Sequence, residues 1–136
     1  YLIKEGKDLN IKINGSKQDR QWIGRDFNVA CQCAKINIGH TGWPDIELCM
    51  SSRDYRVMGS IGFLLTQYVE GMENWFDLWN HCVSYITKGQ CLDMIYHYLD
   101  IPEERSRIAE NGYKFVHENH TFLHRINKIL QDVRKL

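Results

Sequence analysis

The sequence lacks the features that mark several large classes of protein. No apolar run approaches the ~18 residues of a membrane-spanning helix, and no secretory signal peptide opens the chain. Lysine plus arginine and aspartate plus glutamate are balanced at 17 each. No strongly basic field is therefore available to hold nucleic acid through counterion release. These absences predict a protein that neither spans a membrane nor binds nucleic acid.

Common cofactor and metal motifs are also missing. The chain contains no G-x-G-x-x-G fingerprint, no P-loop, no G-x-S-x-G elbow and no C-x2-C pair. The odd number of cysteines, five, and their apolar neighbours predict reduced core thiols in a cytoplasmic protein rather than a disulfide framework. His117, His120 and His124 have a spacing that one continuous helix could present to zinc. A helix boundary is expected before Thr121, so we interpret them as a solvated helix junction and predict no metal site.

What is present is the pattern of one α/β domain. The 136 residues and their hydrophobic share of 43% suit a single unit spanning 1–136. Residues 9–15 alternate apolar and polar side chains and end in Asn-Gly, which predicts a strand. Further strands are expected at 35–39, 63–66 and 81–85, with helices at 25–34, 51–60 and 88–99.

The last third of the chain predicts two more helices. Pro102 suits the first turn of one of them. Thr121 is expected to cap the other. Its apolar stripe is expected to be buried, and consists of Phe122, Ile126, Ile129, Leu130 and Val133.

Alternating strands and helices predict a Rossmann-like parallel sheet with helices on both faces. In such sheets ligands bind outside the carboxyl ends of the strands. Gly15, Gly39 and His40 lie at the carboxyl ends of two of the expected strands, and glycine permits close approach of a backbone. A ligand site is therefore expected at this edge of the sheet.

A helix start rich in hydroxyl groups and arginine is the most informative segment. Ser51 or Ser52 is the candidate N-cap of this helix, and Arg53 and Arg56 lie one helical turn apart. Guanidinium groups bind phosphate through paired hydrogen bonds, and a helix N-terminus favours anions. The alternative is that Arg53 forms a surface ion pair with Asp45, Glu47 or Asp54.

Four aromatic residues are expected in loops. They could stack on a base or a sugar, or cap the core and anchor an interface. They are Trp43, Tyr68, Trp75 and Trp79.

Spaced motifs between residues 52 and 125 resemble those of a known family. In order they read RDYR at 53–56, GFLLT at 62–66, ENWF at 73–76, YHYL at 96–99, PEERSRIAENG at 102–112, and His120, Thr121 and Arg125. This succession resembles the C-terminal half of group 1 glycosyltransferases with the GT-B fold, most closely the spore-maturation-type subgroup.

The resemblance implies a domain that binds a nucleoside diphosphate sugar without a metal ion. It also implies a longer enzyme whose N-terminal half, in cis or in trans, carries the acceptor site and the usual catalytic base. A complete GT-B enzyme has two such domains, so we expect this chain alone to be inactive. The expected donor-binding residues are Ser52, Arg53, Tyr55, Arg56, Gly15, Gly39, His40, Glu47 and Gly62.

One position departs from the family pattern. Arg56 stands where the family has a glutamate that accepts hydrogen bonds from donor hydroxyls, and arginine has no acceptor lone pair. Glu47 lies one residue from the other acidic position of the family and is the candidate substitute. Three interpretations follow: the donor domain of an enzyme, a non-catalytic binding or regulatory module of the same fold, or a fold match with a partner-protein role.

Overall fold

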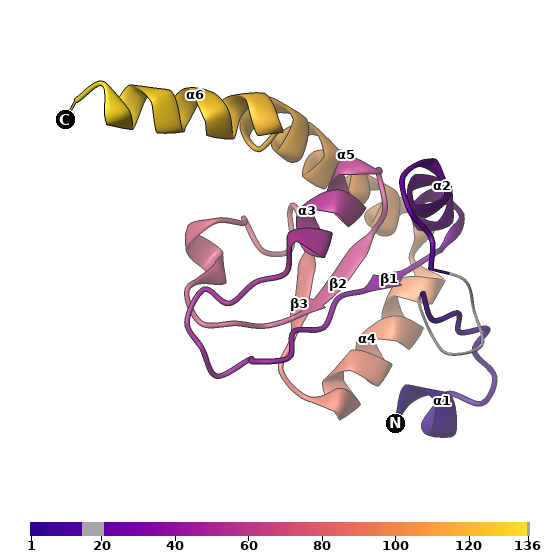
Figure 1. Cartoon of the computed structure of the whole chain (residues 1–136). Helices are drawn as coiled ribbons and strands as arrows, with labels where there is room; N and C mark the ends of the chain where they lie inside the picture. The colour runs from indigo at the N-terminus through magenta and orange to yellow at the C-terminus, as the bar shows by residue number, and fades with distance from the viewer. Residues whose placement is uncertain (15–20, 136) are drawn as a thin grey trace.

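A three-stranded parallel sheet forms the centre of the computed structural model, which describes residues 1–14 and 21–135. The strands are ordered β1-β2-β3, and both neighbouring pairs are parallel (Figure 1). Their bounds are Asn37–Ile38 for β1, Leu64–Gln67 for β2 and Val83–Tyr85 for β3. The predicted Rossmann-like α/β class is confirmed.

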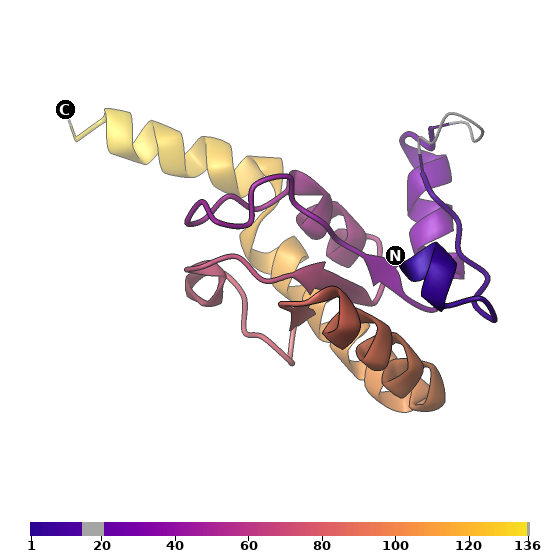
Figure 2. The ribbon, with the colours of Figure 1, turned by 90° about the horizontal axis from the view of Figure 1, so that it is seen from below.

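Helices lie on both faces of this sheet (Figure 2). Their bounds are Leu2–Glu5 for α1, Arg25–Cys33 for α2, Ser52–Gly59 for α3, Lys88–Asp100 for α4, Pro102–Asn119 for α5 and Phe122–Val133 for α6. A short 3-10 helix, η1, covers Met72–Asn74. Among the described residues we find no helix with the length and hydrophobicity of a membrane span.

The sheet separates two hydrophobic clusters. Because successive strand residues face opposite sides, Leu64 joins the cluster under α2 and α3, whereas Leu65 joins the one under α4. Helix α5 contributes to both, through Ile108 to the second and Val116 to the first. Both faces of β2 are thus covered, which explains why its sequence shows no polar alternation.

Local capping signals place two helix starts as predicted. The Ser51 side chain accepts a hydrogen bond from the Arg53 N–H at the start of α3. Thr121 caps α6 in a reciprocal arrangement with His124. Each cap satisfies backbone groups that the first turn of a helix leaves without partners.

The predicted strand at 9–15 is wrong over its described part. No strand covers residues 9–14, and Gly15 lies outside the described residues. The Leu9 N–H donates to the Gly6 carbonyl in a turn, and the Leu9 side chain packs against the cluster under α4. Alternation alone did not produce a strand here, because no neighbouring strand pairs with this segment in the described structure.

The cysteines are free thiols, as expected, but only some lie in the core. Cys31, Cys82 and Cys91 are buried, whereas Cys33 is exposed and Cys49 is half-buried. Burial raises the pKa of Cys82 to about 12 and that of Cys91 to about 11, which keeps both thiols protonated at neutral pH.

The predicted burial of the last helix is also wrong. Phe122 is 86% exposed and Ile129 is 60% exposed. Helix α6 extends away from the body of the domain, so most of its length faces no other element of the described residues (Figures 1 and 2). The exposed stripe, called the α6 apolar face below, consists of Phe122, Ile126, Ile129, Leu130 and Val133.

We expect Gly112→Ala to destabilise the domain by about 2 kcal/mol, because a Cβ on Gly112 would lie 2.5 Å from the backbone oxygen of His81. This cost outweighs the gain of up to ~1 kcal/mol in helix propensity. Gly89→Ala in α4 is the matched control, since the nearest atom lies 3.9 Å away. Urea denaturation measures both variants. Equal stabilities for the two would contradict the close packing at Gly112.

The exposure of the α6 apolar face gives a second prediction. Ile129→Lys should change the free energy of unfolding by less than about 0.5 kcal/mol. The same change at Ile108, which is fully buried in α5, should prevent folding. Denaturation at two protein concentrations distinguishes an uncovered helix from self-association. A cost of several kcal/mol for Ile129→Lys would show that its face is covered in solution.

Candidate functional site

The predicted ligand edge is formed by the loop after β1, the loop after β2 and the start of α3. Helix α3 begins at Ser52 and packs against β2, with Val57 and Met58 buried beneath it. This packing directs the N-terminus of α3 to the carboxyl end of the sheet (Figure 1). The arrangement is the one in which parallel sheets bind ligands.

Gly39, at the end of β1, is a packing position. A Cβ there would lie 2.3 Å from the Thr66 hydroxyl oxygen and 2.9 Å from a carboxylate oxygen of Asp54. The Gly39 carbonyl accepts a hydrogen bond of 2.9 Å from the Tyr85 hydroxyl. The space left by the missing side chain is therefore occupied by protein groups, which fix where β1 ends relative to α3.

Asp54 is the buried charge of this edge, with only 4% of its surface exposed. Its carboxylate lies 3.4 Å from the Thr66 hydroxyl, which donates to it. Burial raises the pKa of Asp54 to about 6, although the Thr66 hydrogen bond, the Arg53 charge and the Ser51 backbone oppose that rise. From the sequence we expected Asp54 only as a possible surface partner of Arg53, and its burial was not predicted.

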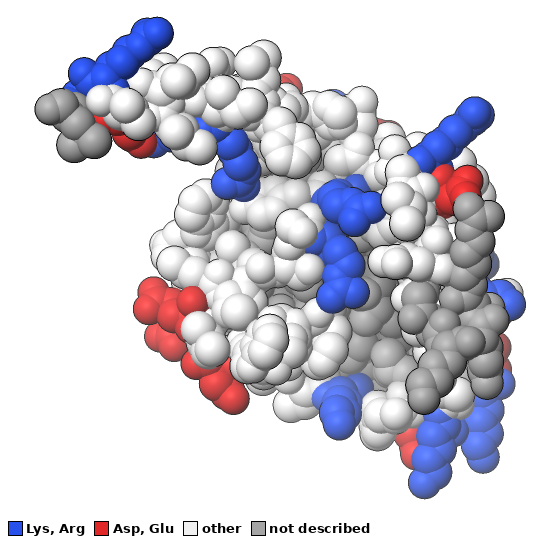
Figure 3. All heavy atoms as spheres, in the orientation of Figure 1, with Lys and Arg blue, Asp and Glu red and all other residues white. Residues whose placement is uncertain are grey.

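The two arginines share one exposed face of α3. Arg53 Nε donates to the Ser51 hydroxyl oxygen at 3.2 Å. The Arg56 guanidinium carbon lies 4.2 Å from the centre of the Phe27 ring of α2. Within residues 1–14 and 21–135 neither arginine forms an ion pair, so the predicted alternative partners of Arg53 are not within 4.0 Å. Basic side chains accordingly lie in front of α3, whereas acidic ones gather at the left edge of this face (Figure 3).

The other expected site residues divide between this edge and other places. Ser52, His40 and Glu47 are exposed around it, and Glu47 lies in the loop that packs on Gly71. Gly62 lies at the opposite, amino end of β2, where a Cβ would lie 2.7 Å from the Asn37 amide nitrogen. Gly15 falls outside the described residues.

Tyr55 turns away from the arginines into an aromatic cluster. Its ring lies 5.0 Å from that of Phe76 and 5.1 Å from that of His120. The Arg125 guanidinium lies 5.2 Å from the Tyr55 ring centre. Residues 55 and 53 point to different sides of α3 because each helical residue is rotated by about 100°.

A small pocket of about 190 Å³ lies where α6 leaves the body. Trp75 and Arg125 line it together with aliphatic side chains from the loop before α3. Sequence reasoning missed it, although both residues fall in the quoted family motifs. Its lining is Leu48, Met50, Tyr55, Trp75 and Arg125.

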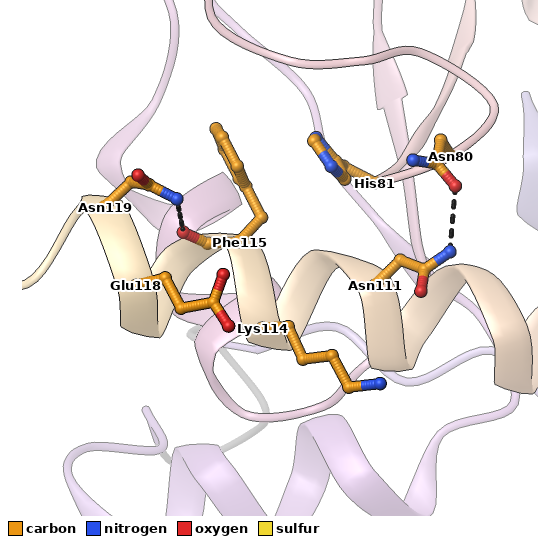
Figure 4. Close-up of a pocket in the computed structure, with 7 residues that line it drawn as sticks. All are labelled: Asn80, His81, Asn111, Lys114, Phe115, Glu118 and Asn119. Atoms are coloured by element: carbon orange, nitrogen blue, oxygen red, sulfur yellow. Dashed lines mark hydrogen bonds between the residues drawn. The ribbon is translucent and has the colours of Figure 1, made fainter.

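A second, more polar hollow of about 250 Å³ lies on α5 (Figure 4). His81 stacks on Phe115 with ring centres 4.2 Å apart, and Asn111 donates to Asn80 at 2.8 Å. These contacts connect the loop before β3 to α5. The hollow contains no residue that we expected in the site.

The three spaced histidines have separate structural roles. His117 contacts the Gly59 carbonyl, His120 packs among aromatic rings, and His124 caps α6. Burial and nearby positive groups lower the pKa of His120. No set of metal-ligand side chains is assembled in the described part of the chain.

Comparison with known proteins gives one result. The family model described as Glycosyl transferase-like matches residues 2–131 of the chain. A search of curated proteins and a search of solved structures each give no match.

The burial of Asp54 predicts a pH-dependent stability. The pKa of Asp54 is about 6 in the folded state, against 3.8 for an unperturbed carboxyl. The protonated carboxyl therefore contributes fully to the free energy of unfolding below pH 3.8, and this contribution is lost as the pH rises through 6. The free energy of unfolding of Asp54→Asn, compared with that of the unsubstituted protein, should therefore rise by about 2 kcal/mol between pH 4 and pH 7. Urea denaturation across this range measures the difference, with the exposed Asp132→Asn as control. A difference in the free energy of unfolding that stays constant from pH 4 to pH 7 would contradict the raised pKa of Asp54.

Proposed function

Because the chain belongs to the glycosyl transferase-like family, we propose that it is the donor-binding domain of a glycosyltransferase. The enzyme would transfer a sugar from a nucleoside diphosphate sugar to an acceptor. The observation that carries the proposal is the exposed pair of Arg53 and Arg56 at the carboxyl edge of a parallel sheet, where neither forms an ion pair within the described structure.

In this proposal the donor diphosphate would bind at the start of α3. Arg53 lies in the first turn of that helix, where the backbone dipole also favours an anion. When the sugar leaves, negative charge develops on the diphosphate, and a guanidinium stabilises it. We propose that protein groups supply this stabilisation and that no metal ion is required.

The surrounding residues have supporting roles in this proposal. The Ser52 hydroxyl and His40 lie exposed at the same edge and would donate to phosphate or ribose oxygens. The exposed Glu47 would accept from sugar hydroxyls. Tyr55 and Gly62 would act indirectly, since they pack against other parts of the protein. Donor chemistry of this kind and the free thiols fit a cytoplasmic protein.

The second domain of the enzyme would cover the α6 apolar face. Five large apolar side chains on one exposed helix favour burial against another surface. The pocket beside Trp75 and Arg125 lies at the root of the same helix and would receive a side chain from that domain. The acceptor site and the catalytic base would come from the second domain, so we expect no sugar transfer by this chain alone.

Titration of the chain with UDP, GDP and their sugar conjugates tests the proposal. One nucleotide should bind, and Arg53→Ala should weaken its binding about 10- to 100-fold, the range expected for loss of a charge-assisted contact. Arg107→Ala on α5, which removes an exposed arginine away from α3, should leave the affinity unchanged. Equal affinities for Arg53→Ala and the unsubstituted chain would contradict the placement of the diphosphate.

A further inference from the structure

We infer that the donor carries an anionic group in addition to its diphosphate, and that Arg56 recognises that group. The inference rests on the proposed function and deepens it by naming the class of donor. It is drawn from the position of Arg56 on α3, its contact with Phe27 and the absence of acidic partners among the described residues.

Arg53 and Arg56 occupy successive positions along the helix. Residues three apart on a helix face have Cβ atoms about 5–6 Å apart. Arg53 lies at the N-terminus, beside the expected diphosphate, and Arg56 lies one turn further along. Arg56 would therefore contact the group next to the diphosphate rather than the same phosphate oxygens.

Phe27 holds the Arg56 guanidinium in a defined place. The Phe27 ring is only 6% exposed and belongs to the cluster under α3, so its orientation is fixed by packing. The guanidinium carbon lies 4.2 Å from the centre of that ring. A guanidinium over a ring keeps its N–H groups available at its edges, and a preorganised cation loses little entropy when it binds.

The guanidinium of Arg56 favours an anionic group as its ligand. Its side chain only donates hydrogen bonds, and its fork matches the paired oxygens of a carboxylate or a phosphate. The nearest acid on α3, Asp54, is buried and accepts a hydrogen bond from Thr66. The positive charge of Arg56 is thus left for a ligand to neutralise. The matching donor is one with a carboxylate on its sugar or a phosphate on its ribose.

Matched pairs of ligands test this inference by calorimetry at physiological ionic strength. UDP-glucose is compared with UDP-glucuronate, GDP-mannose with GDP-mannuronate, and ADP with its 3′-phosphorylated form. The acidic member of one pair should bind at least tenfold tighter, and the pair that shows the preference identifies whether the group is on the sugar or on the ribose. Arg56→Gln should abolish the preference, so that the acidic and the neutral member of the pair bind with equal affinity.

Arg53→Gln provides the matched comparison, since it should weaken both members of a pair equally. Arg107→Gln, away from α3, should change neither. If nucleotides bind but no acidic member is preferred, the inference is wrong and the proposed function stands. If no nucleotide binds, both are wrong.

Discussion

The close approach of α5 to the rest of the domain at Gly112 holds the two hydrophobic clusters in one structure. Gly112 is buried against the His81 backbone and the Met58 side chain, and Met58 is itself fully buried in α3. Because Ile108 and Val116 of α5 belong to different clusters, this one helix packs against the hydrophobic clusters on both faces of the sheet. The position of α3, and with it the start of the ligand edge, is set by this contact, because a larger residue would separate the helices.

Some of the eight residues of α3 pack in the interior, and others lie on the surface that we assign to the donor. Asp54, Val57 and Met58 face the interior, and the two arginines face solvent. The exposed pair keeps its geometry because the buried residues of the same helix are held by β2 and α5. Burial of the Asp54 carboxyl is costly, and the group accepts a hydrogen bond from Thr66 at the place where β1, β2 and α3 meet. Such local cost is typical of binding sites, where a polar group is fixed at the expense of stability.

Local patterns predicted the elements whose signals are local. Ser51, Pro102 and Thr121 marked helix starts correctly, since a cap depends on residues within one turn. The alternation around Leu9 failed because a strand requires a partner that the local pattern does not specify. The apolar stripe on α6 was predicted correctly, but its exposure was not. Periodicity shows which face of a helix is apolar, and it does not show what covers that face. The pocket beside Trp75 was missed for the same reason: its walls come from four separate segments.

A rotation of α6 at the junction near His120 moves the far end of the helix much more than its base. The helix has 12 residues, so it is about 18 Å long, and the Arg125 contact with Tyr55 joins its first turn to the body. A rotation of about 10° at that junction would move the far end by about 3 Å, given this length. The aromatic rings around His120 and the Arg125 contact with Tyr55 therefore set the direction in which a distant apolar surface is presented. Small changes of packing at the base of the helix become large displacements at its tip.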